Sequence, residues 1–225
     1  MTHFAFPPPA QSTVPVEGSD SVFPVRRILC VGRNYAAHAR EMGADTRDPP
    51  FFFAKPADAV VTGDKVPYPV ATHDLHHEIE LVVALKSGGA NIAVEEALSH
   101  VFGYAVGINL TRRDLQAAAK AKGHPWDAGK GFDASAPISA IVPAGRAHPD
   151  GAITLSVNGQ PRQHGQVAAM IWTIPEIIAE ASKLWTLAAG DLIFTGTPEG
   201  VGALGRGDRV EGAVEGVGKL AFTVV

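Results

Sequence analysis

The chain has 225 residues, which is enough for one large domain with a substantial apolar core. A net charge of -4 gives no basic field for nucleic acid, and the single cysteine, Cys30, excludes an internal disulfide framework or a multi-cysteine zinc site. Because no apolar run approaches the ~18 residues of a bilayer span and the N-terminus lacks signal-peptide features, we expect a cytoplasmic protein with no membrane or nucleic-acid partner.

The first segment, residues 1–25, contains three consecutive prolines and little periodic pattern. We expect a Pro-rich arm that lies on the body or is partly disordered, followed by one domain over residues 26–225. The 24 glycines and 17 prolines favour many short strands and turns over a helical bundle. Short, often β-branched runs predict strands over 27–31, 58–61, 78–85, 103–108, 137–142, 152–158, 191–195, 209–214 and 219–224.

Helices are expected to be few. Residues 34–42 have little to break a helix, and residues 94–102 have the pattern of a short amphipathic helix. Capping-box patterns predict one helix that opens at residues 111–114 and ends before Gly123, and another that opens at residues 173–176. Helices interspersed among many strands indicate an α+β fold and not a doubly wound sheet.

Two glutamates, Glu78 and Glu80, are the most informative pair in the chain. They lie at the start of the apolar run 78–85, where residues i and i+2 of a strand point to the same side. Two carboxylates so close repel each other unless a cation lies between them, and a hard divalent ion such as Mg²⁺ or Mn²⁺ suits oxygen ligands. The alternative is an edge strand with both carboxylates in water.

A second pair, His38 and Glu41, lies three residues apart in the predicted helix 34–42 and would share one face of it. A carboxylate beside an imidazole fixes its tautomer and raises its basicity, as a general base requires. The alternative is a surface helix with an incidental His–Glu contact.

Two lysines and one Gly-rich loop complete the candidate site residues. Lys55 follows three phenylalanines and Lys130 lies between two glycines, settings from which a lysine can stabilise a developing negative charge or merely reach water. The loop 195–202 lacks the Gly-Lys-Ser/Thr of a nucleotide-binding loop. Its backbone N–H groups and the Thr197 hydroxyl are better suited to a small carboxylate.

Together these motifs resemble the fumarylacetoacetate hydrolase family, in its short acylpyruvate-hydrolase branch. The resemblance covers the chain from about residue 26 to the end, and the run 123–127 is most similar to bacterial members that act on fumarylpyruvate. The ordered series is Val31-Gly32-Arg33-Asn34-Tyr35 with His38 and Glu41, then Phe53-Ala54-Lys55-Pro56, His76-His77-Glu78-Ile79-Glu80, Gly103-Tyr104 through Thr111-Arg112-Arg113-Asp114, Pro125-Trp126 to Lys130, and Thr195-Gly196-Thr197-Pro198 with Gly200-Val201-Gly202.

The resemblance implies a β-rich α+β fold, with mixed sheets in a roll or barrel-like arrangement and a few short helices. It also implies a homodimer with one Mg²⁺ or Mn²⁺ per chain and a small-molecule substrate, a 2,4-dioxo acid whose carbon–carbon bond is cleaved. Water attacks the C4 carbonyl, the C3–C4 bond breaks, and pyruvate leaves as its enolate. For fumarylpyruvate the other product would be fumarate, in gentisate catabolism.

The same resemblance assigns roles to individual residues. Glu78 and Glu80 would be metal ligands, and His38, oriented by Glu41, would activate water. Lys130 would stabilise the oxyanion or the leaving enolate. The substrate would be held by Arg33, Arg113, Gln116 and Thr197, with Lys55 near the cleft.

One position departs from the family pattern. The third metal ligand of the family is an aspartate, and this chain has Asn109 there. Asparagine offers a carbonyl oxygen at the same reach but removes one negative charge, so we expect weaker metal binding. A metal-impaired, non-catalytic relative therefore stays open as an alternative to the hydrolase. A keto-acid decarboxylase or a keto–enol isomerase would use the same metal and also stays open, but neither needs water activated by His38 and Glu41, so that pair favours hydrolysis.

Overall fold

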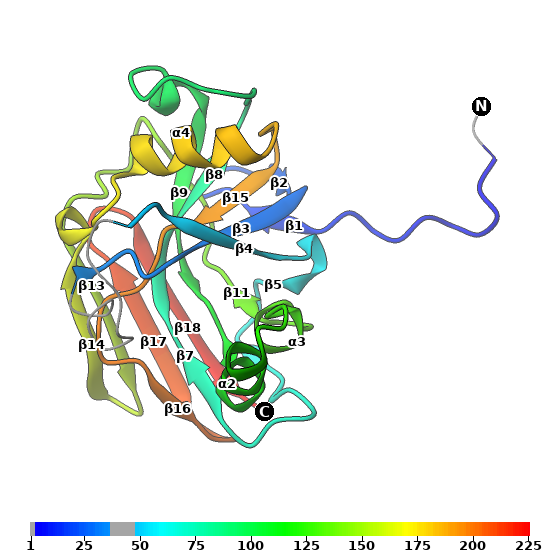
Figure 1. Cartoon of the computed structure of the whole chain (residues 1–225), viewed down its shortest axis with the longest axis vertical. Helices are drawn as coiled ribbons and strands as arrows, with labels where there is room; N and C mark the ends of the chain where they lie inside the picture. The colour runs from blue at the N-terminus through cyan, green and yellow to red at the C-terminus, as the bar shows by residue number, and fades with distance from the viewer. Residues whose placement is uncertain (1–2, 37–47) are drawn as a thin grey trace.

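The computed structural model describes residues 3–36 and 48–225. At its centre lies a six-stranded mixed sheet (Figure 1). β15 pairs parallel with β3, and the other neighbours pair antiparallel. The strand order is β12 (Val142–Pro143), β9 (Val101–Ile108), β8 (Ile79–Leu85), β15 (Asp191–Phe194), β3 (Arg27–Gly32) and β4 (Phe51–Lys55).

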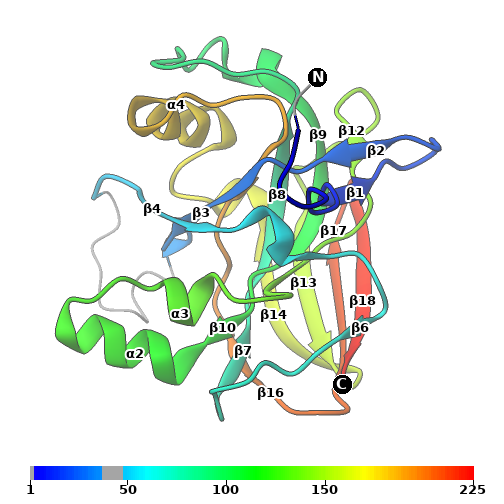
Figure 2. The ribbon, with the colours of Figure 1, turned by 90° about the vertical axis from the view of Figure 1, so that its right-hand side faces the viewer.

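A five-stranded sheet packs against one face of the central sheet (Figure 2). Its strands alternate between buried apolar and outward polar residues, as expected for a sheet with one solvated face. Because the two sheets are open and mixed, the fold is β-rich α+β, as predicted, but not a closed barrel. The strand order is β14 (Gln160–Gln166), β13 (Ala152–Val157), β17 (Arg209–Val214), β18 (Gly218–Val224) and β6 (Lys65–Val66).

Three small sheets complete the strand pairing of the described residues. One of them is an N-terminal hairpin. They are β10 (Thr111–Arg112) with β7 (Leu75–His77) and β16 (Gly202–Leu204), β11 (Ala136–Pro137) with β5 (Val60–Val61), and β1 (Thr13–Pro15) with β2 (Val22–Pro24).

The described helices are short. The α-helices are α2 (Arg113–Lys122), α3 (Asp127–Lys130) and α4 (Ile174–Leu184), and the 3₁₀ helices are η1 (Ala57–Ala59), η2 (Ala97–His100) and η3 (Val167–Ala169). The predicted capping box of α4 is confirmed, since the Glu176 carboxylate accepts the Thr173 N–H at 2.8 Å. None of the helices in residues 3–36 and 48–225 has the length and hydropathy that a membrane span requires.

The predicted capping box at the start of α2 is wrong, although the helix ends where predicted. Thr111 belongs to β10 and donates its hydroxyl to Glu78, so it is not available to cap the helix. The Asp114 carboxylate accepts hydrogen bonds from the Thr72 hydroxyl and the His73 N–H, which ties α2 to the loop before β7.

Three other predicted elements differ from the structure. Residues 94–102 form turns and η2, because Val101 and Phe102 already belong to β9. Residues 58–61 divide into the end of η1 and the two-residue β5. Residues 137–142 are not one strand, because β11 ends at Pro137, a single bridge joins Ile138 to Gly107 of β9, and the next strand, β12, begins only at Val142. Most of the predicted helix 34–42 lies outside the described residues.

The apolar core has two parts, one on each face of β8. Leu81 and Val83 point into the larger cluster between the two big sheets. Val82 and Ala84 point into a second cluster, which the N-terminal hairpin covers. Residues 13–25 are therefore packed on the body, whereas residues 3–10 are exposed and run away from it (Figure 1). Glu80 is two residues before Val82 and Glu78 is two residues before Glu80. Because every second side chain of an extended chain points to the same face, both glutamates lie on the face of the second cluster.

Candidate active site

A cavity opens where β3, β4 and β8 meet α2, α3 and the loop after β15. The cavity and its open mouth together enclose about 400 Å³. Apolar, acidic and basic side chains share its wall. The lining residues are Val31, Gly32, Arg33, Phe51, Phe53, Glu78, Glu80, Arg113, Gln116, Trp126, Lys130 and Thr197.

Both glutamates of the 78–80 pair reach this cavity, and both are buried. Glu80 is the second residue of β8, and Glu78 occupies the single position between β7 and β8. The Glu78 carbonyl accepts the Asn109 N–H at 2.8 Å, which extends the β8–β9 pairing by one residue. The i,i+2 spacing therefore brings the two carboxylates to one side of the chain.

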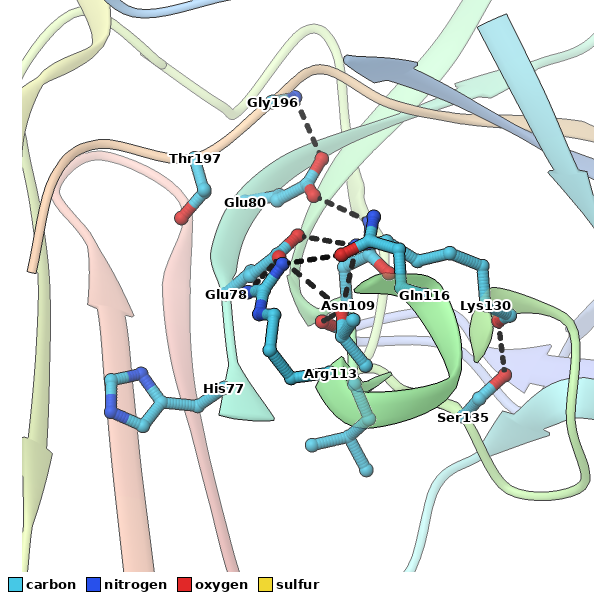
Figure 3. Close-up of polar contacts among 12 residues, drawn as sticks. His77, Glu78, Glu80, Asn109, Arg113, Gln116, Lys130, Ser135, Gly196 and Thr197 are labelled. Atoms are coloured by element: carbon cyan, nitrogen blue, oxygen red, sulfur yellow. Dashed lines mark hydrogen bonds and ion pairs between the residues drawn. The ribbon is translucent and has the colours of Figure 1, made fainter. Parts of the chain in front are cut away.

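Glu78 is surrounded by cationic and hydroxyl donors (Figure 3). Arg113 Nη2 donates to Oε1 at 2.7 Å, and Lys130 Nζ donates to Oε2 at 2.8 Å. Thr111 Oγ1 approaches Oε1 at 3.2 Å and also accepts from Lys130 Nζ at 2.6 Å. Two cations thus compensate for the buried charge of Glu78.

Glu80 has a different environment, with an exposure of only 1%. Asn109 Nδ2 donates to Oε1 at 2.8 Å, and the Gly196 N–H donates to Oε2 at 2.6 Å (Figure 3). Neither donor is charged. Burial and the neighbouring Glu78 charge raise the pKa of Glu80 to about 7, against the opposing effect of these hydrogen bonds. A carboxylate in this position is stabilised by a proton or by a further cation.

The residues around Glu80 fit a hard divalent cation. Asn109 Oδ1 is buried and has no hydrogen-bond partner among the described residues. With the carboxylates of Glu78 and Glu80 it offers oxygen-only coordination, which Mg²⁺ and Mn²⁺ prefer. Toward such a cation Asn109 would supply a third oxygen donor but no charge.

The two candidate lysines have different places. Lys130, the last residue of α3, lines the cavity. Lys55 does not line it; its Nζ lies behind Lys130, where it donates to the Leu110 carbonyl at 3.1 Å and to the Lys130 carbonyl. Burial lowers the pKa of Lys55 to about 7. The contacts of Lys55 are thus with the backbone that carries other site residues.

Apart from Lys55, the predicted substrate-binding residues line the cavity on several sides. Arg113 Nη1 donates to Gln116 Oε1 at 2.6 Å, so both side chains are held together on α2. The Arg33 guanidinium lies 5.4 Å from the centre of the Phe51 ring. Phe51 in turn meets Trp126 edge-on at 5.6 Å. Arg33 makes no hydrogen bond or ion pair with any residue in the described part of the chain.

The predicted general-base pair, His38 and Glu41, lies outside the described residues. Its role stays a prediction from the sequence.

Several residues around the site were not identified from the sequence. Thr111 looked like a helix cap, and the N–H of Gly196 was expected to face a ligand carboxylate but binds Glu80. Gln163 is hydrogen-bonded both to Ile79, 84 residues earlier in the chain, and to Thr197, 34 residues later. No local signal marks Gln163, because its segment, Gln160–Gln166, is polar and contains a proline.

Comparison with known proteins identifies the family of the chain. The sequence model of the fumarylacetoacetate (FAA) hydrolase C-terminal family matches residues 27–225. A fumarylpyruvate hydrolase from Ralstonia sp is 46% identical over 176 residues, which cover 77% of this chain and 92% of the relative. The mitochondrial oxaloacetate tautomerase of Rattus norvegicus is 43% identical over 202 residues, which cover 88% of this chain and 91% of the relative.

Solved structures extend the similarity to nearly the whole chain. Fumarylpyruvate hydrolase from Pseudomonas aeruginosa, in complex with Mn²⁺ and pyruvate, is 50% identical with a TM-score of 0.96 and covers 99% of both chains. A putative fumarylpyruvate hydrolase from Burkholderia cenocepacia is 52% identical with a TM-score of 0.94, over 100% of this chain and 95% of that one. The chain therefore belongs to the fumarylacetoacetate hydrolase family.

Proposed function

We propose that this protein is a divalent-cation-dependent hydrolase that cleaves the C3–C4 bond of 2,4-dioxo acids, with fumarylpyruvate as the preferred substrate. The products would be fumarate and pyruvate, as a step of gentisate breakdown. The observation that carries the proposal is one cavity that holds two buried carboxylates, three cationic side chains and an aromatic wall. The similarity of the chain, over 99% of its length, to a fumarylpyruvate hydrolase in complex with Mn²⁺ and pyruvate supports the same proposal.

The charges in the cavity match the two ends of such a substrate. Glu78, Glu80 and Asn109 would hold the cation, which when bound would act as a Lewis acid toward the C1 carboxylate and the C2 oxygen. Arg33, which has no acidic partner among the described residues, and the nearby Phe51 and Trp126 suit a flat, unsaturated acyl group that ends in a second carboxylate.

The chain's own residues would carry the proton and charge movements. His38, oriented by Glu41, would take a proton from a water molecule while the oxygen of that water attacks C4. The C3–C4 bond then breaks, its electron pair forms the pyruvate enolate, and C3 takes up a proton. Lys130, whose Nζ lies 2.8 Å from Glu78 Oε2, would place its positive charge beside the negative charge that develops.

A panel of acylpyruvates tests the proposal, with the loss of dioxo-acid absorbance as readout and Mg²⁺ or Mn²⁺ present. We expect one pyruvate and one carboxylic acid per substrate consumed, faster with fumarylpyruvate than with acetylpyruvate. Arg33→Met should reduce this preference, whereas Arg162→Met, a change on the exposed side of β14, should not. The proposal is refuted if no acylpyruvate is cleaved in the presence of either cation.

The second candidate function is oxaloacetate tautomerisation, because mitochondrial relatives with that name are 41–43% identical. That reaction moves a proton between carbon and oxygen and needs neither an attacking water nor a site for a long acyl group. Enol–keto exchange of oxaloacetate at a rate above that of acylpyruvate cleavage would favour it.

A further inference from the structure

One buried amide, that of Gln163, connects three parts of the active site. The side chain points inward from β14 and is 2% exposed, whereas its neighbours Arg162 and His164 are exposed. Its Oε1 accepts the Ile79 N–H at 3.0 Å and lies 2.9 Å from His77 Nδ1. Its Nε2 donates to Thr197 Oγ1 and to the Pro198 carbonyl, both at 2.8 Å. The amide thus uses both donors and both lone pairs.

These partners fix the orientation of the amide. A backbone N–H can only donate, so the atom that faces Ile79 is the oxygen. A carbonyl can only accept, so the atom that faces Pro198 is the nitrogen. His77 Nδ1 consequently carries the hydrogen that Gln163 Oε1 accepts.

The orientation has a consequence for Thr197, which lines the cavity. Because Thr197 Oγ1 accepts the Gln163 N–H, the hydrogen of the hydroxyl points to another acceptor. No residue in the described part of the chain accepts that hydrogen. A hydroxyl in this state is a prepared donor for an acceptor group of a ligand in the cavity.

The same amide also sets where Thr197 lies relative to the carboxylate pair. Ile79, whose N–H it binds, stands between Glu78 and Glu80. The loop of Thr197 packs tightly on β14, because a Cβ at Gly200, where φ is +89°, would lie 2.1 Å from the Arg162 carbonyl oxygen. The carboxylates and the hydroxyl are therefore held at a fixed separation by the side chain and backbone of β14.

We propose that Gln163 is a positioning residue that presets the Thr197 hydroxyl as a hydrogen-bond donor to the carboxylate of a 2-oxo acid. The proposal rests on the proposed function only for the class of ligand, and it holds for a dioxo-acid hydrolase and for an oxaloacetate tautomerase. Because the Thr197 hydroxyl is already oriented before the ligand arrives, less conformational entropy is lost when the ligand binds.

The test measures the Kd of pyruvate for the Mg²⁺-loaded protein by calorimetry. Thr197→Val removes the donor, and a hydrogen bond to a charged group is worth about 10- to 100-fold in affinity. Gln163→Glu keeps the size of the side chain but replaces the donor by an acceptor. The Thr197 hydroxyl would then turn to donate to the new carboxylate, so we expect a rise in Kd similar to that of Thr197→Val.

The double variant separates positioning from general damage. Gln163→Glu should add little to the Kd of Thr197→Val, because the group through which it acts is already gone. Gln166→Met, a change to an exposed glutamine of the same strand, should leave the Kd unchanged. Melting temperatures check that each variant is folded, and Gln163→Met provides a second, uncharged replacement.

Three results would overturn the inference. The first is an unchanged pyruvate Kd in both Gln163→Glu and Gln163→Met, and the second is a Kd increase in the double variant equal to the product of the two single increases. The third is no binding of pyruvate by the unaltered protein. Failure of the proposed function is recognised separately. If the unaltered protein binds pyruvate and the variants behave as expected, but no acylpyruvate is cleaved, the hydrolase proposal fails and the role of Gln163 stands.

Discussion

Replacing Asn109 by aspartate should make the protein less stable without metal and more responsive to metal. Asn109 Nδ2 now donates to Glu80 Oε1 at 2.8 Å, and the change substitutes a carboxylate for this donor. Two unit charges about 4 Å apart repel by about 4 kcal/mol at an effective dielectric constant of about 20. The lost hydrogen bond adds to this cost, and proton uptake by the pair reduces it.

The net loss of unfolding free energy at pH 8 should therefore be about 2–4 kcal/mol in the apo protein. For a chain of this size that corresponds to a melting temperature about 4–16 °C lower. With Mg²⁺ or Mn²⁺ the added carboxylate becomes a charged ligand, so we expect at least a tenfold lower metal Kd, or about 1.4 kcal/mol more stabilisation at saturation. Hydrolysis at limiting metal should rise with it.

Thermal melts in EDTA and in a metal series measure both effects. Asn158→Asp is a matched control, because Asn158 Nδ2 also donates to a carboxylate, that of Asp208, at 2.8 Å but on the surface. Its change should cost at most about 1 kcal/mol and should not depend on metal. If Asn109→Asp and Asn158→Asp show the same metal-dependent shift, Asn109 does not face the metal, and the assigned ligand set is wrong.

Three further predictions concern the same cavity. Glu80→Gln should weaken Mg²⁺ or Mn²⁺ binding far more than Glu95→Gln, a change at an exposed position, and equal metal titrations of the two variants would contradict the ligand role of Glu80. His38→Ala should lower the hydrolysis rate about 10²- to 10⁴-fold and leave metal affinity nearly intact, whereas normal cleavage by this variant would favour the tautomerase. In the apo protein the folded state binds the Glu80 proton more tightly than the unfolded state does, since the pKa is raised from 4.5 to about 7. This stabilisation is complete below pH 4.5 and lost as the pH rises to about 7, so urea unfolding in EDTA should reveal a loss of about 3 kcal/mol that is absent from Glu80→Gln.

The parts of the site that the sequence predicts well are those encoded by neighbouring residues. Glu78 and Glu80 are two positions apart on an apolar run, so strand geometry alone places both carboxylates on one side. The strands that were predicted most closely, such as 209–214, have one buried and one solvated face and therefore a clear alternation. The capping box of α4 is likewise a local pattern, and it is confirmed.

What the sequence does not reveal are contacts between distant segments. Lys130 reaches Glu78 across 52 residues, and Lys55 reaches the carbonyl of Lys130 across 75. Thr111 has the sequence pattern of a helix cap, but its hydroxyl binds Glu78, since a buried carboxylate is a stronger acceptor than the alternatives nearby. β14 has no apolar alternation to mark it, so its pairing with β13 and the contacts of Gln163 emerge only from the fold.

The place of β15 in the central sheet determines the order in which the nascent chain can fold. β15 fills the space between β3 and β8, two strands made more than 100 residues earlier. Until residues 191–194 leave the ribosome, β3 and β8 each present an unpaired edge, and the acidic pair lacks the Gly196 N–H and the Thr197 hydroxyl. Pairing over such sequence distances is slow and leaves edges open to other chains. A chain truncated before residue 191 should therefore aggregate rather than fold into a smaller, metal-binding domain.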